Sequence, residues 1–186
     1  MTFEEMKALP PDKQKTLFNR LKSLRGPYKA ANYSCIYGVG KAKLARELDL
    51  KVKDAAELIE AYWQRNWAVR ELSKDQVVKT VGNEMWLYNP VSGFWYSLRY
   101  EKDSFSTLNQ GTGVYVFDTW KAFVKKRGER VALEYHDEFL LRLSKGKEGE
   151  TEANIAWAIE KTNEKIKLNV RIECDNQFGK TYAEVH

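Results

Sequence analysis

Residues 29–48 read KAANYSCIYGVGKAKLAREL, a stretch in which a predicted helix with an unusual face is followed by a turn. Counting back in fours from Tyr37 gives Tyr33, Lys29 and Arg25, and Gly38 follows immediately. Side chains four residues apart lie on one face of a helix, so this spacing predicts two cations followed by two aromatic rings. A core face would be aliphatic, and a solvated face needs no paired tyrosines. The pattern favours a face that holds a ligand with phosphates at one end and a flat ring at the other.

The composition is that of a globular chain with one ordinary domain or two small subdomains. The 186 residues are 43% hydrophobic and 31% charged, and the net charge is +5. This mildly basic balance is compatible with a polyanionic partner but does not identify one. The N-terminus lacks the apolar region of a signal peptide, and no run approaches the roughly 18 apolar residues of a membrane span. We therefore expect a reducing, cytosol-like compartment and no membrane partner.

Cysteine and aromatic usage narrows the classes of site. Cys35 and Cys174 lie far apart without CxxC spacing, so the sequence predicts neither a disulfide framework nor a zinc site. Aromatic residues make up 13% of the chain, with six Trp and ten Tyr. Such rings stack on bases in some nucleic-acid-binding proteins, although a place in the core is the commoner role for any one of them.

The hydrophobic spacing predicts a helical first part followed by a mixed part. We expect helices at residues 12–24, 27–36, 41–48, 54–72, 108–126 and 151–165. Gly26-Pro27 is predicted to separate the first two, and Asp54 to cap the fourth. We expect short strands between residues 75 and 100, a hairpin within 130–143, and a last strand at 167–175. The predicted fold class is α+β, with an antiparallel β-hairpin in the second part.

A second constellation, His136-Asp137-Glu138, falls at the predicted tip of the hairpin. Tight turns favour Asp, so one interpretation is a turn residue followed by a solvated Glu. The other is a carboxylate held at a strand end to bind a hard cation. Magnesium prefers oxygen ligands and keeps substrate phosphates in its shell, and two such ions can act together in phosphoryl transfer.

The sequence resembles the C-terminal half of the polymerase domain of family A DNA polymerases, the group of bacterial polymerase I and the phage replicases. The fingers helix of that family reads Arg, three residues, Lys, three residues, Phe or Tyr, three residues, Tyr-Gly, and residues 25–38 match every place. The family's palm hairpin reads His-Asp-Glu, as at residues 136–138, and a palm helix opens with a Gln that matches Gln110 in LNQGTG. Many members also end in His, as here at His186. Single-subunit RNA polymerases usually carry Met where Tyr33 stands and His-Asp-Ser in the hairpin, so both positions favour a DNA polymerase.

The resemblance implies a lead-in helix at residues 1–24, a helical fingers subdomain at 25–80 and a C-terminal palm portion with the hairpin at 81–186. It implies template-directed addition of deoxynucleotides to a primer 3′ end by two-metal phosphoryl transfer. The implied partners are primer–template DNA and dNTPs, and the implied cofactors are two Mg²⁺ ions. The implied location is the cytoplasm of a bacterium or of an infected host cell.

In the fingers helix, the resemblance implies that Arg25 and Lys29 contact the triphosphate and that Lys29 protonates the leaving pyrophosphate. Tyr33 would lie against the sugar and base of the incoming nucleotide. Family members with Tyr at this place tolerate a sugar without its 3′-hydroxyl, so weak discrimination against dideoxynucleotides is expected. Tyr37 would stack at the templating position, where Gly38 lets the backbone turn.

In the palm, the resemblance implies that Gln110 and His136 touch the primer–template near the new base pair. Asp137 would ligate the metal ions, with Glu138 beside it as a second catalytic carboxylate.

The family's first palm motif, which supplies another essential Asp ahead of the fingers helix, has no match here. Only 24 residues precede Arg25, and the one Asp among them, Asp12, has no predicted strand around it. The thumb and any exonuclease domain have no match either. We therefore expect half of a split polymerase, active only with a separate N-terminal polymerase fragment. The alternatives are a remnant that binds nucleotide or nucleic acid without catalysis, and an α+β domain in which the motifs are coincidental.

Overall fold

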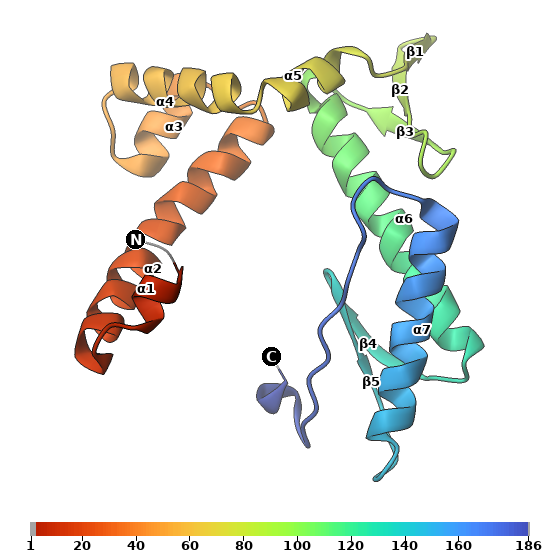
Figure 1. Cartoon of the computed structure of the whole chain (residues 1–186). Helices are drawn as coiled ribbons and strands as arrows, with labels where there is room; N and C mark the ends of the chain where they lie inside the picture. Colours follow the sequence, from red (N-terminus) through yellow and green to blue (C-terminus); the bar gives the residue numbers. More distant parts are fainter. Residues whose placement is uncertain (1–2, 186) are drawn as a thin grey trace. The chain divides into compact units, whose positions relative to one another are not determined.

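The computed structural model describes residues 3–185 and divides into two compact units. The first unit takes in the chain up to Tyr88 together with residues 95–108, and the second takes in residues 89–94 and the chain from Asn109 onward. The fold is α+β, as the sequence predicts (Figure 1). His186 lies outside the described residues. None of the helices within residues 3–185 combines the length and the apolar character that crossing a bilayer requires.

The first unit is mainly helical. Its helices are α1 (Phe3–Lys7), α2 (Pro11–Ile36), α3 (Lys41–Leu48), α4 (Val52–Arg65) and α5 (Trp67–Lys74), and a short 3₁₀ turn, η1 (Glu101–Asp103), comes later. The prediction of a helix boundary at Gly26-Pro27 was wrong, because α2 runs through both residues. Proline fixes φ near the helical value, so a helix can pass through it with the loss of one hydrogen bond, here the bond to the Ser23 carbonyl. Arg25 consequently lies inside the helix and not at its edge.

The predicted helix at 54–72 is in fact two helices, α4 and α5, which are separated at Asn66. The Asn66 side chain donates to the Tyr62 carbonyl at 2.9 Å, a local bond of the kind that competes with helix continuation. Asp54 lies in the first turn of α4, and the residue at the cap position is Lys51. The predicted capping role of Asp54 was therefore wrong.

A small core joins α2, α3 and α4. Leu44, Ala45 and Ala55 form its buried centre, around which other apolar side chains of α3 and α4 pack. From α2, Ala31 and Cys35 are buried, with 8% and 1% of their surface exposed. The left-handed conformation of Asp49, with φ of 53°, ends α3 as predicted.

The first unit also contains a three-stranded antiparallel sheet in the order β1 (Val78–Val81), β2 (Glu84–Tyr88) and β3 (Trp95–Leu98), which confirms the strands expected in this region. Leu87 and Leu98 are its most buried residues. Gly82 and Gly93 adopt positive φ in the two turns, which glycine accepts without strain.

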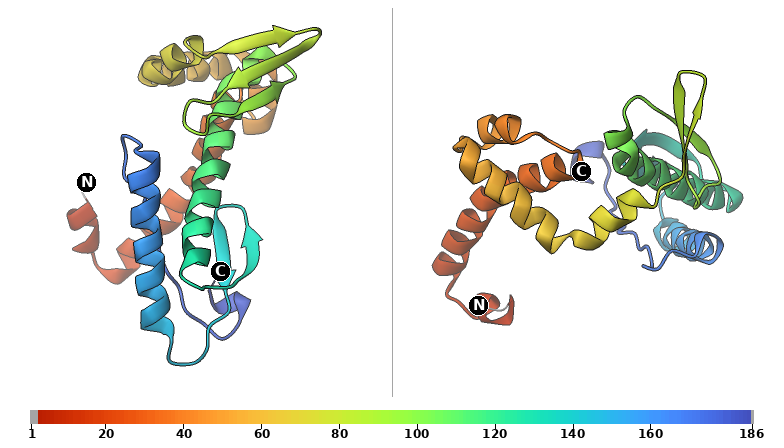
Figure 2. Two further views of the ribbon diagram at one scale, coloured as in Figure 1. Left: turned by 90° about the vertical axis from the view of Figure 1, so that its right-hand side faces the viewer. Right: turned by 90° about the horizontal axis from the view of Figure 1, so that it is seen from above.

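The second unit contains most of α6 (Ser104–Lys126), the hairpin of β4 (Val131–Tyr135) and β5 (Glu138–Leu141), α7 (Glu148–Ile166) and the C-terminal tail, which ends in the 3₁₀ turn η2 (Tyr182–Glu184). Figures 1 and 2 show α7 running beside α6. The Phe123 and Trp157 rings meet between these two helices at 5.9 Å. The predicted hairpin and the helix predicted at 151–165 are confirmed, and α6 begins four residues before its predicted start at 108.

The last predicted strand, at 167–175, was wrong: these residues form no strand, Lys167 is left-handed with φ of 55°, and residues 169–170 form a bend. Their backbone is held by a side chain. The Asn163 amide on α7 donates to the Ile172 carbonyl and accepts from the Ile172 N–H, both at 2.8 Å. This reciprocal pair takes the place of a neighbouring strand, which explains why an alternating sequence forms no strand here.

Candidate functional site

The candidate residues fall into two groups, one in each unit. Residues 25–38 lie on α2 and the turn that follows it, in the first unit. Gln110 and residues 136–138 lie in the second unit, on α6 and the hairpin.

The face of α2 that bears Arg25, Lys29 and Tyr33 is exposed along its whole length. The Lys29 ammonium lies 5.5 Å from the centroid of the Tyr33 ring, one helical turn away. Half of the Tyr33 surface and 45% of the Tyr37 surface are accessible. The structure therefore places the cations and rings on a helix surface that a ligand can reach.

The opposite side of α2 fixes the orientation of this face. Cys35 packs against the helical core, and burial raises the pKa of its thiol. Burial and the nearby Cys35 also raise the pKa of Tyr62 on α4. The Ser34 hydroxyl donates to Glu47 of α3 at 3.1 Å. We call the exposed row of Arg25, Lys29, Tyr33 and Tyr37 the ladder. Since the back of the helix is anchored in this way, the ladder has a fixed orientation.

Tyr37 and Gly38 form the end of α2 and the turn that follows it. Tyr37 caps α2, and its N–H donates to the Tyr33 carbonyl at 2.9 Å. Gly38 follows with φ of 67°, a left-handed conformation that favours glycine. The turn that was predicted at Gly38 is therefore present, and it leaves the Tyr37 ring at the end of the ladder.

In the second unit, the hairpin presents His136 and Asp137 as its two-residue turn, between the paired residues Tyr135 and Glu138. His136 has φ of 55°, in the left-handed region where His, Asn and Asp are the commonest non-glycine residues. His136 and Asp137 are exposed, and Glu138 is half-buried. The turn thus holds two carboxylates at adjacent positions at one end of a rigid element.

An aromatic cluster joins the hairpin to α6. The Phe139 ring lies 4.3 Å from the Trp120 ring and 5.7 Å from the Phe117 ring, measured between centroids. A two-stranded hairpin is marginal by itself in water, so contacts of this kind are needed to hold it. The indole N–H of Trp120 is buried and has no hydrogen-bond partner within residues 3–185.

Polar contacts complete the attachment of the hairpin. The Lys121 ammonium bonds to Asp118 at 2.7 Å and to Glu134 of β4 at 2.8 Å. These bonds, to Asp118 first and then to Glu134, raise the pKa of Lys121. At the start of the hairpin, Glu129 accepts hydrogen bonds from two residues of α7. They are Thr151 at 3.0 Å and Asn154 at 2.8 Å.

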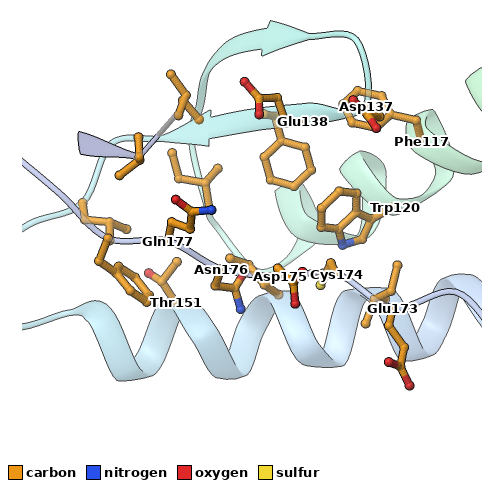
Figure 3. Close-up of a pocket in the computed structure, with 18 of the residues that line it drawn as sticks. Phe117, Trp120, Asp137, Glu138, Thr151, Glu173, Cys174, Asp175, Asn176 and Gln177 are labelled. Atoms are coloured by element: carbon orange, nitrogen blue, oxygen red, sulfur yellow. The ribbon is translucent and has the colours of Figure 1, made fainter. Parts of the chain in front are cut away.

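The C-terminal tail borders the hairpin as well. Residues 173–177 run between the hairpin and α7 (Figure 3). The hairpin, α6, α7 and the tail line a cavity of about 1420 Å³ that includes Asp137 and Glu138 in its wall. Partial burial, and then the charges of Glu138 and Tyr135, raise the pKa of Tyr182. The tail therefore places the Tyr182 phenol within electrostatic reach of Glu138.

Gln110 is exposed on α6. It was predicted at the opening of the helix but lies well inside it, because α6 begins at Ser104. It shares the second unit with the hairpin. The turn between β2 and β3 also contacts α6, since buried Asn89 donates to Thr112 at 3.0 Å and the Phe94 and Tyr115 rings meet at 6.2 Å. These contacts fix the part of α6 that carries Gln110.

Sequence reasoning missed the residues that position the hairpin and the tail beside it. Lys121, Glu129, Asn163 and Tyr182 act through partners between 9 and about 50 positions away in the chain, and no local motif marks them. The one available signal was the aromatic spacing of Phe117 and Trp120 on the predicted helix, which indicates an apolar face but not its partner.

The donors in the second unit fit part of a magnesium shell. Asp137 and Glu138 offer the carboxylate oxygens that Mg²⁺ prefers. Within residues 3–185, no three His, Cys, Asp or Glu side chains gather closely enough to hold a metal ion. Two carboxylates at a turn suit a site whose remaining ligands come from substrate phosphates, water and other protein groups.

Comparisons with known proteins find similarity to DNA polymerases. No protein-family model matches the chain. It is 25% identical over 172 residues to DNA polymerase I of Lactococcus lactis subsp. cremoris (strain MG1363), a match that covers 84% of this chain and 19% of that protein. Its fold is similar to the POL domain of Pol1 from M. smegmatis, solved in complex with DNA primer-template and dNTP. That match has a TM-score of 0.57 and 23% identity and covers 75% of this chain and 28% of that chain.

The chain therefore spans less than a third of the length of either relative. The sequence match and the structural match nevertheless agree with the resemblance carried by residues 25–38 and 136–138. In sequence the chain is similar to part of a DNA polymerase I, and in fold it is similar to the polymerase domain of Pol1, which is consistent with a C-terminal fragment of a family A DNA polymerase.

Proposed function

We propose that this chain is the C-terminal fingers-and-palm part of a template-directed DNA polymerase, which adds deoxynucleotides to a primer 3′ end in the cytoplasm of a bacterium or an infected host cell. In this proposal, residues 1–24 lead into fingers at 25–80 and a palm portion at 81–186. The observation that carries it is the exposed ladder of two cations and two rings on α2, together with a His-Asp-Glu hairpin of the matching family type.

The ladder accounts for nucleotide binding. Arg25 and Lys29 contact the triphosphate, Tyr33 lies against the sugar and base, and Tyr37 stacks at the templating base. The primer 3′-oxygen attacks the α-phosphorus, and the bond to the β-phosphate oxygen breaks. Lys29 gives a proton to the pyrophosphate that leaves, which lowers the cost of its negative charge.

The hairpin accounts for metal and primer binding. Asp137 is the proposed ligand of two Mg²⁺ ions, with Glu138 beside it, and Gln110 and His136 touch the primer–template near the new base pair. When bound, the ions stabilise the charge on the attacking and leaving oxygens. The described residues contain no group of three or more side chains that could hold a metal ion, and we propose that a separate chain supplies the first palm Asp and the thumb.

Primer extension tests the proposal. The chain is mixed with a candidate N-terminal polymerase fragment, a labelled primer–template, dNTPs and Mg²⁺. We expect synthesis from the mixture and none from either protein alone. Asp137→Asn keeps the size of the turn residue but removes its charge, and should lower the rate by several orders of magnitude. Glu152→Gln, at an exposed position of α7, is the matched control and should leave the rate unchanged.

Absence of synthesis from the mixture, with DNA still bound, would favour the alternative of a non-catalytic nucleotide- or nucleic-acid-binding remnant.

A separate assay examines the place of Tyr33. Chain termination by dideoxynucleotides should be efficient in the wild type and weaker in Tyr33→Phe. Strong rejection of dideoxynucleotides by the wild type would contradict the placement of Tyr33 against the sugar.

A further inference from the structure

A second face of α2, distinct from the ladder, carries an apolar stripe with coiled-coil spacing. Its residues, spaced alternately four and three apart, are Leu17, Leu21, Leu24, Tyr28, Ala31 and Cys35. Alternating steps of this kind form a continuous seam along one side of a helix and are typical of helices that pack against another helix. We call the first four residues the N-terminal seam.

The two halves of this stripe have different surroundings. Ala31 and Cys35 are buried by the helices of the same unit, with 8% and 1% of their surface exposed. In the N-terminal seam, Leu21 is 46% exposed, Leu24 is 45% exposed and Tyr28 is 67% exposed. The same face is therefore covered by protein helices at Ala31 and Cys35 and exposed from Leu21 to Tyr28, while Leu17 is half-buried.

The charges around the N-terminal seam are mostly positive. Six cations on α2 stand against a single acid, Asp12. The cations are Lys13, Lys15, Arg20, Lys22, Arg25 and Lys29. All six are exposed, and no ion pair formed between residues 3 and 185 involves any of them. In heptad geometry, Lys13, Arg20 and Arg25 fall at the positions that flank the seam, where a partner helix would place its own charges.

We propose that the N-terminal seam is a docking surface for an amphipathic helix of a protein partner, with an aliphatic stripe and acidic flanks. Continuity with the buried half of the stripe indicates a helical protein occupant, and the mostly positive charge indicates acidic flanks. A second copy of this chain would bring like charges together across the seam, which opposes association. Nucleic acid would pair with the cations but would leave the leucines uncovered, because its affinity comes from phosphates.

The proposal does not depend on nucleotide transfer, and its test measures binding alone. The probe is a fluorescent four-heptad peptide with Leu at the seam positions and Glu at the flanking positions. A control peptide keeps the Leu seam and carries Lys at the flanks. We expect the full chain to bind the acidic peptide, more weakly as salt is raised, and not the basic one.

Matched variants locate the binding surface. Leu21→Gln with Leu24→Gln keeps good helix formers but makes the seam polar. This double change should lower the affinity for the acidic peptide at least about tenfold. Asn19→Gln with Ser23→Gln, at positions away from the seam, should have no effect. Hydrogen exchange of the wild-type chain gives a measurement that needs no variant: the acidic peptide should protect residues 17–28.

Three results would overturn the proposal. Equal binding of both peptides, or binding that the seam change leaves intact, would mean that the seam is not the surface. A dimer seen by light scattering, and dissolved by the seam change, would make a second copy the occupant. A duplex oligonucleotide that displaces the peptide, and itself loses affinity through the seam change, would make nucleic acid the occupant.

Discussion

The ladder on α2 and the hairpin turn carry the two halves of the proposed chemistry, but they are held in different ways. On α2, the spacing of Arg25, Lys29 and Tyr33 follows from helix geometry, and one buried side of the helix fixes the orientation. At the hairpin, the position of Asp137 depends on an aromatic cluster with α6 and an ion pair from Lys121.

Substitutions in the two regions should therefore affect different properties of the protein. Side chains of the ladder point to solvent, so changing them should alter chemistry and leave stability nearly intact. Side chains that hold the hairpin never reach the ligand in the proposal, so changing them should alter stability first and activity as a consequence.

Apart from the loss expected for Asp137→Asn, the largest effect is expected at Lys29. Lys29→Met should lower the rate of primer extension by roughly 10²–10⁴-fold, the contribution typical of a general acid. The free energy of unfolding should change by no more than about 0.5 kcal/mol, because the side chain is exposed. Single-turnover kinetics and urea unfolding give the two values. Lys22→Met, another exposed lysine of α2, is the control; an equal loss of rate there would assign the effect to general charge.

The next effect is expected at the aromatic cluster. Trp120→Ala should lower the free energy of unfolding by about 2–3 kcal/mol, somewhat less than a fully buried aromatic residue contributes. Trp120→Phe keeps a ring against Phe139 and removes the unpaired N–H, so its cost should be much smaller. Urea unfolding measures both. If Tyr33→Ala on the ladder cost as much as Trp120→Ala, the contrast between the two regions would fail.

A smaller effect is expected in the tail. A Cβ at Gly179 would lie 2.7 Å from Cβ of Glu184 and 2.9 Å from Cγ1 of Val185. Gly179→Ala should therefore displace the end of the tail and cost about 1–3 kcal/mol. The raised pKa of Tyr182 should return toward its ordinary value, which a spectroscopic titration measures. Gly149→Ala, where a Cβ meets nothing within 4 Å, is the control and should leave that pKa unchanged.

The smallest effect concerns the ion pair of Lys121. Its pKa is raised above the ordinary value of about 10.4, so its contribution to stability is complete at neutral pH. That contribution is lost only as the pH rises through the folded-state pKa. We expect the loss to be below about 1 kcal/mol, because the carboxylate partners are largely exposed.

Unfolding curves recorded between neutral pH and strongly alkaline pH measure the loss for the wild type and for Lys121→Met. The variant should lack this part of the pH dependence. Identical pH dependence of the two proteins would show that the pair does not hold the hairpin.

Local patterns were predicted well and interrupted patterns poorly. The hairpin, the short strands between residues 75 and 100 and the turn at Gly38 were predicted because alternation and turn residues act over a few positions. A helix boundary was predicted at Pro27, where there is none, and the boundary at Asn66 was not predicted. One helix continued through a residue that usually ends helices, and another stopped at a residue whose side chain competes for a backbone carbonyl.

The sequence by itself determined the α+β class, the ladder of residues 25–38 and the carboxylates of the hairpin turn, because spacing along a helix or across a two-residue turn is a local property. Only the tertiary structure decided what anchors these residues. Cys35 is buried on the side of α2 opposite the ladder, and Asn163 holds the backbone of Ile172 in the absence of a paired strand. Tyr182 lies within electrostatic reach of Glu138. Contacts between distant segments depend on packing and burial, and neither is written in the spacing of neighbouring residues.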